Sequence, residues 1–213
     1  MDAFSVFVRL VIYFTIFAVA GYIIEAFNSL LHERKMRNRG FLFGPYLPIY
    51  GFAGVLMIAV WQCMPHNDYV LTFFVAMLIG AGLEYITSYT LEKIFHLRWW
   101  DYSRSDKFNI NGRVCLRNSI IFGLIGLLFC FLLLPAVDNA INVMPKGLQI
   151  AIALIMTVIY LVDFAASSYA NMKVKNMEEL GKVIGDQTNE IKKNAKKVMK
   201  TLLGNKRKSS KKH

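Results

Sequence analysis

Three carboxylates lie inside long apolar runs of this sequence: Glu25, Glu84 and Asp163. An ionisable side chain in a membrane span is costly, so it tends to face the interior of a helix bundle or a wet cavity. Counted from the inner ends of their runs, all three carboxylates lie roughly 7–11 Å from the same membrane surface. Three helices with an acid at one depth predict a polar pocket, in which the acids could hold a proton, a cation or a polar solute.

A second group of candidate residues fills the polar loop between the third and fourth apolar runs: Arg98, Trp100, Asp101, Tyr102 and Arg113. Aromatic faces beside a carboxylate suit a cation or a planar ring. Arginine suits phosphate or carboxylate. We therefore expect these five residues and the three carboxylates to line one substrate-binding pocket that opens to the cytoplasm.

Both groups also have a structural interpretation. The carboxylates could pair with loop arginines and only fix the packing of the helices. The adjacent Trp99 and Trp100 could anchor the chain at the membrane interface, as aromatic residues often do. The sequence alone leaves both interpretations open.

Several classes of function lack their sequence signals. The chain contains no GxxxxGK[ST] loop, no GxGxxG after a strand, no nucleophile elbow and no HExxH. Its three cysteines and four histidines show no metal-ligand spacing. We predict no cofactor, no metal site and no nucleic-acid partner, and binding or transport is favoured over catalysis. An ATPase that drives transport would be a separate subunit.

The elements that position these residues are long apolar runs, in a chain that is 55% hydrophobic. Roughly 20 apolar residues cross ~30 Å of hydrocarbon as a helix. The sequence therefore predicts an all-α integral membrane protein with five transmembrane helices. Ala18-Val19-Ala20 resembles a signal-peptidase site, but the apolar run continues to Leu31 and a basic segment follows, which favours an uncleaved span. The five runs cover about residues 10–30, 46–64, 70–91, 118–137 and 148–170.

Positive charge is concentrated in alternate segments that follow the first, third and fifth runs. Of the 25 Lys and Arg residues, 23 lie in residues 32–45, 92–117 and 172–213. Cytoplasmic loops carry an excess of Lys and Arg. We therefore predict a multi-pass protein of the cell membrane, with its N-terminus outside and its C-terminus in the cytoplasm.

The chain also shows signs of an internal duplication. When the sequence is slid along itself, one offset aligns Glu25 with Glu84 and Ser29 with Ser88, and a second, longer offset aligns Gly51 with Gly123. The second copy therefore carries an insertion, and this insertion contains the aromatic loop. We expect two parallel two-helix repeats, related by an axis along the membrane normal, plus a fifth helix. The matches are few, so coincidence is the alternative.

The last part of the chain differs from the rest. Residues 172–213 hold thirteen Lys and Arg residues against four acids. We predict a five-span transmembrane domain at 1–171 and a cytoplasmic region at 172–213, made of a basic amphipathic helix and a disordered end after residue 203. The helix is expected to bind membrane lipids of an anionic leaflet. Self-association as a coiled coil, giving a homo-oligomer, is the alternative.

Several motifs carry a family resemblance. They are Gly21-x-x-x-Glu25, Arg39-Gly40-Phe41-Leu42-x-Gly44-Pro45-x-x-Pro48-Ile49-Tyr50-Gly51, Leu83-Glu84-Tyr85-x-Thr87-Ser88, Arg98-Trp99-Trp100-Asp101-Tyr102-Ser103 and Asn109-x-x-Gly112-Arg113-x-Cys115-Leu116. Over about residues 10–170 the chain resembles the bacterial membrane proteins of the putative ABC-transporter type IV, or CmpB-like permease, family. The resemblance implies a permease. Our own first hypothesis is a permease-like subunit that binds or moves a small polar or amphiphilic solute. A membrane enzyme acting on a lipid-linked substrate and a non-catalytic membrane adaptor remain the alternatives.

Overall fold

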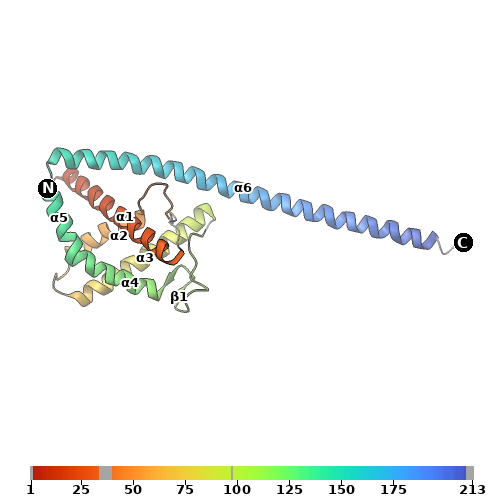
Figure 1. The fold of residues 1–213 in the computed structure, drawn as a ribbon, viewed down its shortest axis with the longest axis horizontal. Coiled ribbons are helices and arrows are strands. Elements are labelled where there is room, and N and C mark those ends of the chain that lie inside the picture. Colours follow the sequence, from red (N-terminus) through yellow and green to blue (C-terminus); the bar gives the residue numbers. More distant parts are fainter. Residues whose placement is uncertain (1, 34–39, 97, 210–213) are drawn as a thin grey trace. The chain divides into compact units, whose positions relative to one another are not determined.

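The computed structural model describes residues 2–33, 40–96 and 98–209 (Figure 1). It is almost entirely helical, with one small antiparallel hairpin in which Asn109 pairs with Cys115. The elements are α1 (Ala3–Glu33), α2 (Pro48–Trp61), α3 (Tyr69–Phe95), β1 (Asn109–Ile110), β2 (Val114–Cys115), α4 (Leu116–Leu128), the π-helix η1 (Phe129–Leu133), α5 (Leu134–Val143) and α6 (Lys146–Ser209). The chain divides into two compact units, Met1–Tyr169 and Ala170–His213.

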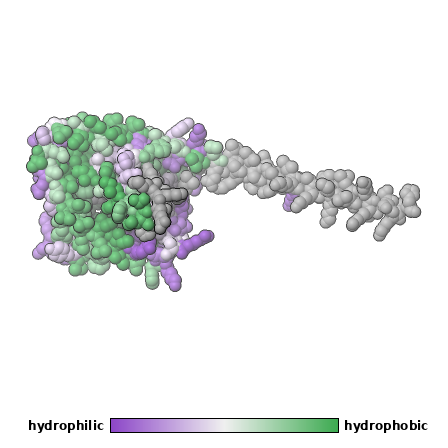
Figure 2. All heavy atoms as spheres, viewed as in Figure 1, coloured by the Kyte–Doolittle hydropathy of each residue, from purple (hydrophilic) through white to green (hydrophobic). Residues whose placement is uncertain are grey.

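The all-α membrane fold is confirmed, with one difference in the second span. Within the described residues, four stretches of 27–29 residues are long and apolar enough to cross a membrane: Ala3–Leu31, Tyr69–Phe95, Leu116–Val143 and Lys146–Val174. The predicted second span is the shorter α2, whose 14 residues extend about 21 Å. The structure forms an irregular loop at Gly40–Leu47 before Pro48 begins this helix, a position where proline is well tolerated. Figure 2 shows a hydrophobic band across the first unit, with hydrophilic residues at its two ends.

The fourth predicted span continues as a helix beyond its expected end. The segment predicted as an outer loop, residues 138–147, is helical through Val143, and Met144 then takes an extended conformation before α6. Pro135 lacks an N–H group and would break a regular helix. The wider π turn at Phe129–Leu133 ends two residues before Pro135, and the chain stays helical past the proline. Likewise α6 is helical through Ser209, beyond the expected start of a disordered end.

The predicted repeat is supported by matching contacts in the two helix pairs. A side chain at Gly21 would overlap the ring of Tyr50, and one at Gly80 would overlap the ring of Phe122. These two pairs correspond under the two offsets of the repeat. The contacts of Gly51 with Phe14 and of Gly123 with Phe73 correspond in the same way. Small residues at these crossings let α1 approach α2 and α3 approach α4 closely.

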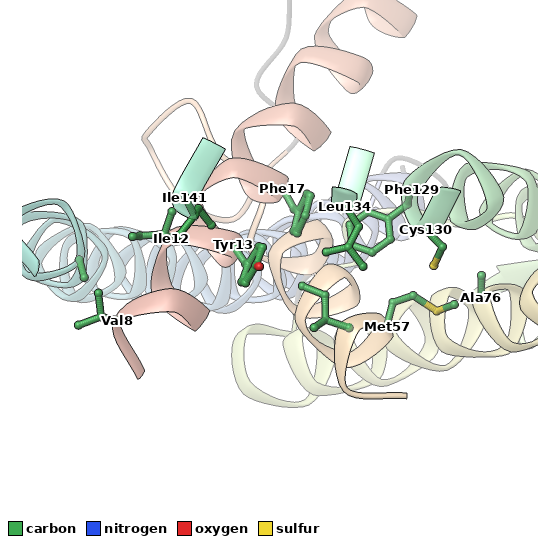
Figure 3. Close-up of a cluster of buried hydrophobic side chains, with 12 residues drawn as sticks. Val8, Ile12, Tyr13, Phe17, Met57, Ala76, Phe129, Cys130, Leu134 and Ile141 are labelled. Atoms are coloured by element: carbon green, nitrogen blue, oxygen red, sulfur yellow. The ribbon is translucent and has the colours of Figure 1, made fainter. Parts of the chain in front are cut away.

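A buried hydrophobic cluster joins the helices (Figure 3). The rings of Phe17 on α1 and Phe129 on η1 lie 4.4 Å apart in an edge-to-face arrangement, and Met57 and Ala76 extend the cluster onto α2 and α3. Because lipid is as apolar as these side chains, the cluster stabilises the bundle mainly through close van der Waals packing.

The segments next to the basic parts of the chain meet at one end of the bundle. The ring of Phe41 lies 5.1 Å from Phe95, 5.8 Å from Trp99 and 5.9 Å from Phe164. These rings belong to the loop before α2, the end of α3 with the loop after it, and α6. We call this the basic end. The basic segment 34–39 itself lies outside the described residues.

We expect the basic end to face the cytoplasm, and cysteine labelling tests this prediction. In a Cys63→Ser background, which removes the exposed native thiol, an impermeant reagent added to intact cells should label Asn67→Cys and Asn142→Cys. Ser105→Cys and Ser209→Cys should react only after lysis, because the positive segments stay inside. Labelling of Ser105→Cys in intact cells would reverse the topology.

Candidate functional site

Two of the predicted carboxylates, one from each repeat, lie in one polar cluster. Glu84 on α3 is only 5% exposed, and its Oε1 accepts a hydrogen bond of 2.8 Å from the Tyr102 hydroxyl. Glu25 on α1 is half-buried, and its Oε1 accepts one of 2.9 Å from the Tyr50 hydroxyl. Glu25 lies within electrostatic reach of Glu84, and the Tyr50 phenol is within reach of both acids and of Tyr102. The side-chain amide of Asn118 donates to the Tyr102 hydroxyl at 2.8 Å. We call these five residues the paired-glutamate cluster.

The two halves of the cluster obtain their phenols differently. Tyr50 on α2 serves Glu25, but Phe122 stands at the matching place on α4 and has no hydroxyl. The second phenol comes instead from Tyr102, in the insertion that only the second repeat has. Burial first, and then the nearby Glu84 carboxylate, raise the pKa of Tyr102. The phenol therefore stays protonated at neutral pH and acts as a donor to the carboxylate.

The loop that carries Tyr102 is folded on itself. Trp100 Nε1 donates to the backbone oxygen of Arg113 at 2.9 Å, and the Tyr102 N–H donates to the oxygen of Gly112 at 2.8 Å. Gly112 has a positive φ of 66°, and a side chain there would overlap those of Asp101 and Ser103. Glycine is needed at this crossing because it combines the backbone conformation with the missing side chain.

Asp101 closes the same loop. It accepts from the side chain and the N–H of Ser103, and both hydrogen bonds hold the pKa of Asp101 below its usual range. Arg98 Nη1 lies 3.1 Å from Oδ2 of Asp101, and the Arg98 guanidinium also donates to the backbone oxygen of Asn111. In this structure Arg98, Trp100 and Asp101 therefore build the loop that holds Tyr102 over Glu84.

Arg113 fastens the loop to α3. Its Nη1 lies 2.6 Å from Oε2 of Glu92 and donates to the Ser88 hydroxyl at 3.2 Å. Its guanidinium carbon lies 5.9 and 5.5 Å from the ring centres of Tyr85 and Tyr89. The described acidic partner of Arg113 is thus Glu92, which the sequence analysis did not single out.

Asp163 has a different set of partners. Its carboxylate accepts from the N–H groups of Phe43 and Gly44 at 2.9 and 2.8 Å, from the Tyr46 hydroxyl at 2.5 Å and from the Ser167 hydroxyl at 2.8 Å. Burial and this carboxylate raise the pKa of Tyr46, which keeps its phenol a donor. Asp163 thereby fixes the loop before α2 to α6. The structural interpretation from the sequence named loop arginines as its partners, whereas the partners described here are backbone N–H groups and hydroxyls.

Two members of the paired-glutamate cluster were missed as site residues: Tyr50 and Asn118. A signal for Tyr50 was present, because it aligns with Phe122 in the repeat, and only the tyrosine can donate a hydrogen bond. Asn118 was taken only as the start of an apolar run, although an amide at a span boundary needs a polar partner.

A polar network at the opposite end was also missed. Arg9 on α1 donates to Oδ1 of Asp138 at 2.5 Å and to Oδ1 of Asn142 at 2.7 Å, and the Tyr13 hydroxyl donates to Asp138 as well. These contacts tie the start of α1 to α5.

The chemical groups of the paired-glutamate cluster limit what it could bind. Among the residues that the structure describes, no three His, Cys, Asp or Glu side chains gather so that they could hold a metal ion. The cluster offers two carboxylates and two phenols, a set suited to a proton, a cation or a hydrogen-bond donor.

Apolar helices in two matching pairs, with an acid pair among them, define a multi-pass helical membrane protein. A family model described as putative ABC-transporter type IV matches residues 12–168. The chain belongs to this family, and the matched region holds every residue of the paired-glutamate cluster. No curated protein and no solved structure matches the chain.

Proposed function

We propose that this protein is a permease-like subunit that binds a small polar or amphiphilic solute at the paired-glutamate cluster. One observation carries the proposal: buried Glu84 and half-buried Glu25, from two different repeats, each accept a hydrogen bond from a tyrosine hydroxyl among apolar helices. The two carboxylates also lie within electrostatic reach of one another. Family membership supports a transporter-like role. A separate ATPase subunit would supply the energy, since the chain has no nucleotide-binding motif.

The chemistry of the cluster indicates which part of the solute it would hold. Two carboxylates that share a poorly hydrated site repel one another, and each has lost part of its hydration. A cationic or hydrogen-bond-donating group between Glu25 and Glu84 would relieve both costs. The Tyr50 hydroxyl orients the Glu25 carboxylate, and the Tyr102 hydroxyl orients the Glu84 carboxylate. The solute is therefore expected to carry an ammonium, guanidinium or similar donor group.

Mass spectrometry of small molecules retained on the purified protein tests the proposal. Glu25→Gln and Glu84→Gln keep the shape of the side chains but remove their charge, so each should retain at least tenfold less of the bound solute. Asp138→Asn is the matched control, because it removes a carboxylate of a membrane helix outside the cluster, and it should retain the solute as the unchanged protein does. Gel filtration and thermal melting would show that all three variants fold.

Two results would contradict this function. One is a wild-type protein that retains no cationic or donor-bearing solute. The other is equal retention by wild type and both glutamine variants.

A further inference from the structure

A hollow of about 240 Å³ opens at the C-terminal end of α3, in the basic end of the bundle. It is lined by Glu92, Lys93, His96 and Arg113. Of the residues in the paired-glutamate cluster, none lines it. Lys93 and His96 are exposed to solvent, and α3 ends as His96 adopts a left-handed conformation with φ of 55°.

The ring of Tyr89 lies close to two cationic side chains beside the hollow, those of Lys93 and Arg113. The ammonium of Lys93 lies 5.6 Å from the ring centre of Tyr89, and the guanidinium carbon of Arg113 lies 5.5 Å from the same centre. The lining acid, Glu92, is already engaged by Arg113 at 2.6 Å and by Arg98 at 3.7 Å. The hollow therefore presents more positive than negative charge. Arginine and lysine together suit the oxygens of a phosphate group.

An open apolar stripe runs along α3 away from this hollow. Leu78 is 65% exposed, Ile86 61% and Tyr89 46%, and steps of three and four residues place them on the face that carries Lys93. Gly82 lies on the same stripe, and a side chain added there would meet nothing within 4 Å. Among the described residues, no other helix covers this part of α3. A molecule with an anionic head in the hollow could lay an apolar tail along it.

We propose that the hollow binds the phosphate headgroup of an anionic phospholipid, with an acyl chain along the stripe of Leu78 and Ile86. The charge is complementary, and α3 is a membrane-spanning helix whose last residues form the hollow, at the depth where headgroups lie. A water-soluble phosphate compound would share the headgroup chemistry but would lack an acyl chain to contact the stripe. This site is separate from the paired-glutamate cluster and has the opposite charge preference.

Native mass spectrometry of the full-length protein in maltoside detergent tests the site. The protein is titrated with phosphatidylglycerol and with phosphatidylcholine of the same acyl chains. Lys93→Gln should weaken phosphatidylglycerol binding about fivefold, the effect of one basic residue at an anionic headgroup. Lys107→Gln is the matched control, because Lys107 is also an exposed lysine of the basic end but does not line the hollow. It should bind the lipid as the wild type does. Arg113→Gln should weaken binding further, with thermal melting as the check on its fold.

Three outcomes would overturn the proposal. Equal weakening by Lys93→Gln and Lys107→Gln would show diffuse attraction to basic charge. Equal affinity of the wild type for the two lipids would show that the headgroup charge is not recognised. Displacement of the lipid by glycerol phosphate at similar concentration would show that the site takes a soluble phosphate compound.

Discussion

Gly126→Val is expected to separate α3 from α4 and to destabilise the protein by about 3 kcal/mol. A Cβ atom at Gly126 would overlap the side chain of Ala76 and lie 3.5 Å from its Cα. Alanine has no rotamer that moves its methyl group away, so the helix backbones must move instead. The equivalent contact in the first repeat, between Gly54 and Phe17, involves a longer side chain that can turn.

Unfolding in mixed dodecyl sulfate and maltoside micelles, followed by helical circular dichroism, would measure this loss. Gly82→Ala is the control on the same helix pair, because its added methyl group meets nothing within 4 Å. It should leave stability unchanged or raise it by about 0.5–1 kcal/mol, since glycine weakens a helix interior. A Gly126→Val protein as stable as the wild type would show that α3 and α4 do not pack as described.

Asp163→Ala is expected to cost about 3 kcal/mol, because it removes the acceptor of two backbone N–H groups and one phenol together. The donors are Phe43, Gly44 and Tyr46, all in the loop that precedes α2. Hydrogen bonds to a charged acceptor are stronger than neutral ones, so the loss of this carboxylate costs more than the loss of the same number of neutral hydrogen bonds. The loop should then detach from α6.

The same micelle unfolding assay applies here, with Ser167→Ala as the control. That change removes one donor to Asp163 and also the second acceptor of the Phe43 N–H, at 3.2 Å, and should cost about 1–2 kcal/mol. The assay also separates the two interpretations of Asp163. If Asp163→Ala loses the retained solute but keeps full stability, this carboxylate binds substrate and its structural role is refuted.

The sequence could predict the depth of the carboxylates but not the direction in which each points. Depth follows from counting residues along a helix, which is why Glu25, Glu84 and Asp163 were placed at one level. Direction about the helix axis depends on which neighbour each helix packs against. For Glu25 and Glu84 the repeat predicted equal depth and symmetric placement about an axis, from which we expected them to face one another. Asp163 has no counterpart in the repeat, and its place against the loop before α2 could not be foreseen.

The aromatic loop shows a second limit. A loop rich in charged and aromatic residues such as Arg98 and Trp100 has the same composition in both cases, whether these side chains face a ligand or pack onto their own loop. The dipeptide Asn111-Gly112 favours a turn, and both residues do have positive φ, 52° and 66°. Turn chemistry of this kind is local and therefore readable from sequence. The partner of Tyr102 lies 18 residues away in the sequence, and nothing local indicates it.

The polar network of Arg9, Asp138 and Asn142 was missed for a related reason. Hydropathy places the first span from about residue 10, so Arg9 was counted with neither span nor loop. Asp138 was assigned to a loop because the fourth apolar run was ended at residue 137. The structure continues the helix past Pro135 to Val143, which brings Asp138 and Asn142 to the start of α1.

The π turn at Phe129–Leu133 rotates the second half of the span Leu116–Val143 about the helix axis relative to its first half. In it the Leu134 N–H bonds to the oxygen of Phe129, so the turn holds one residue more than a regular helical turn. Each residue of an α-helix advances about 100° around its axis, so everything after the extra residue is rotated by about that angle. One continuous segment can thus turn Gly126 toward α3 and still aim Asp138 at Arg9 on α1. In a regular helix of the same sequence these two directions would be out of phase, and the span could satisfy only one of its two neighbours.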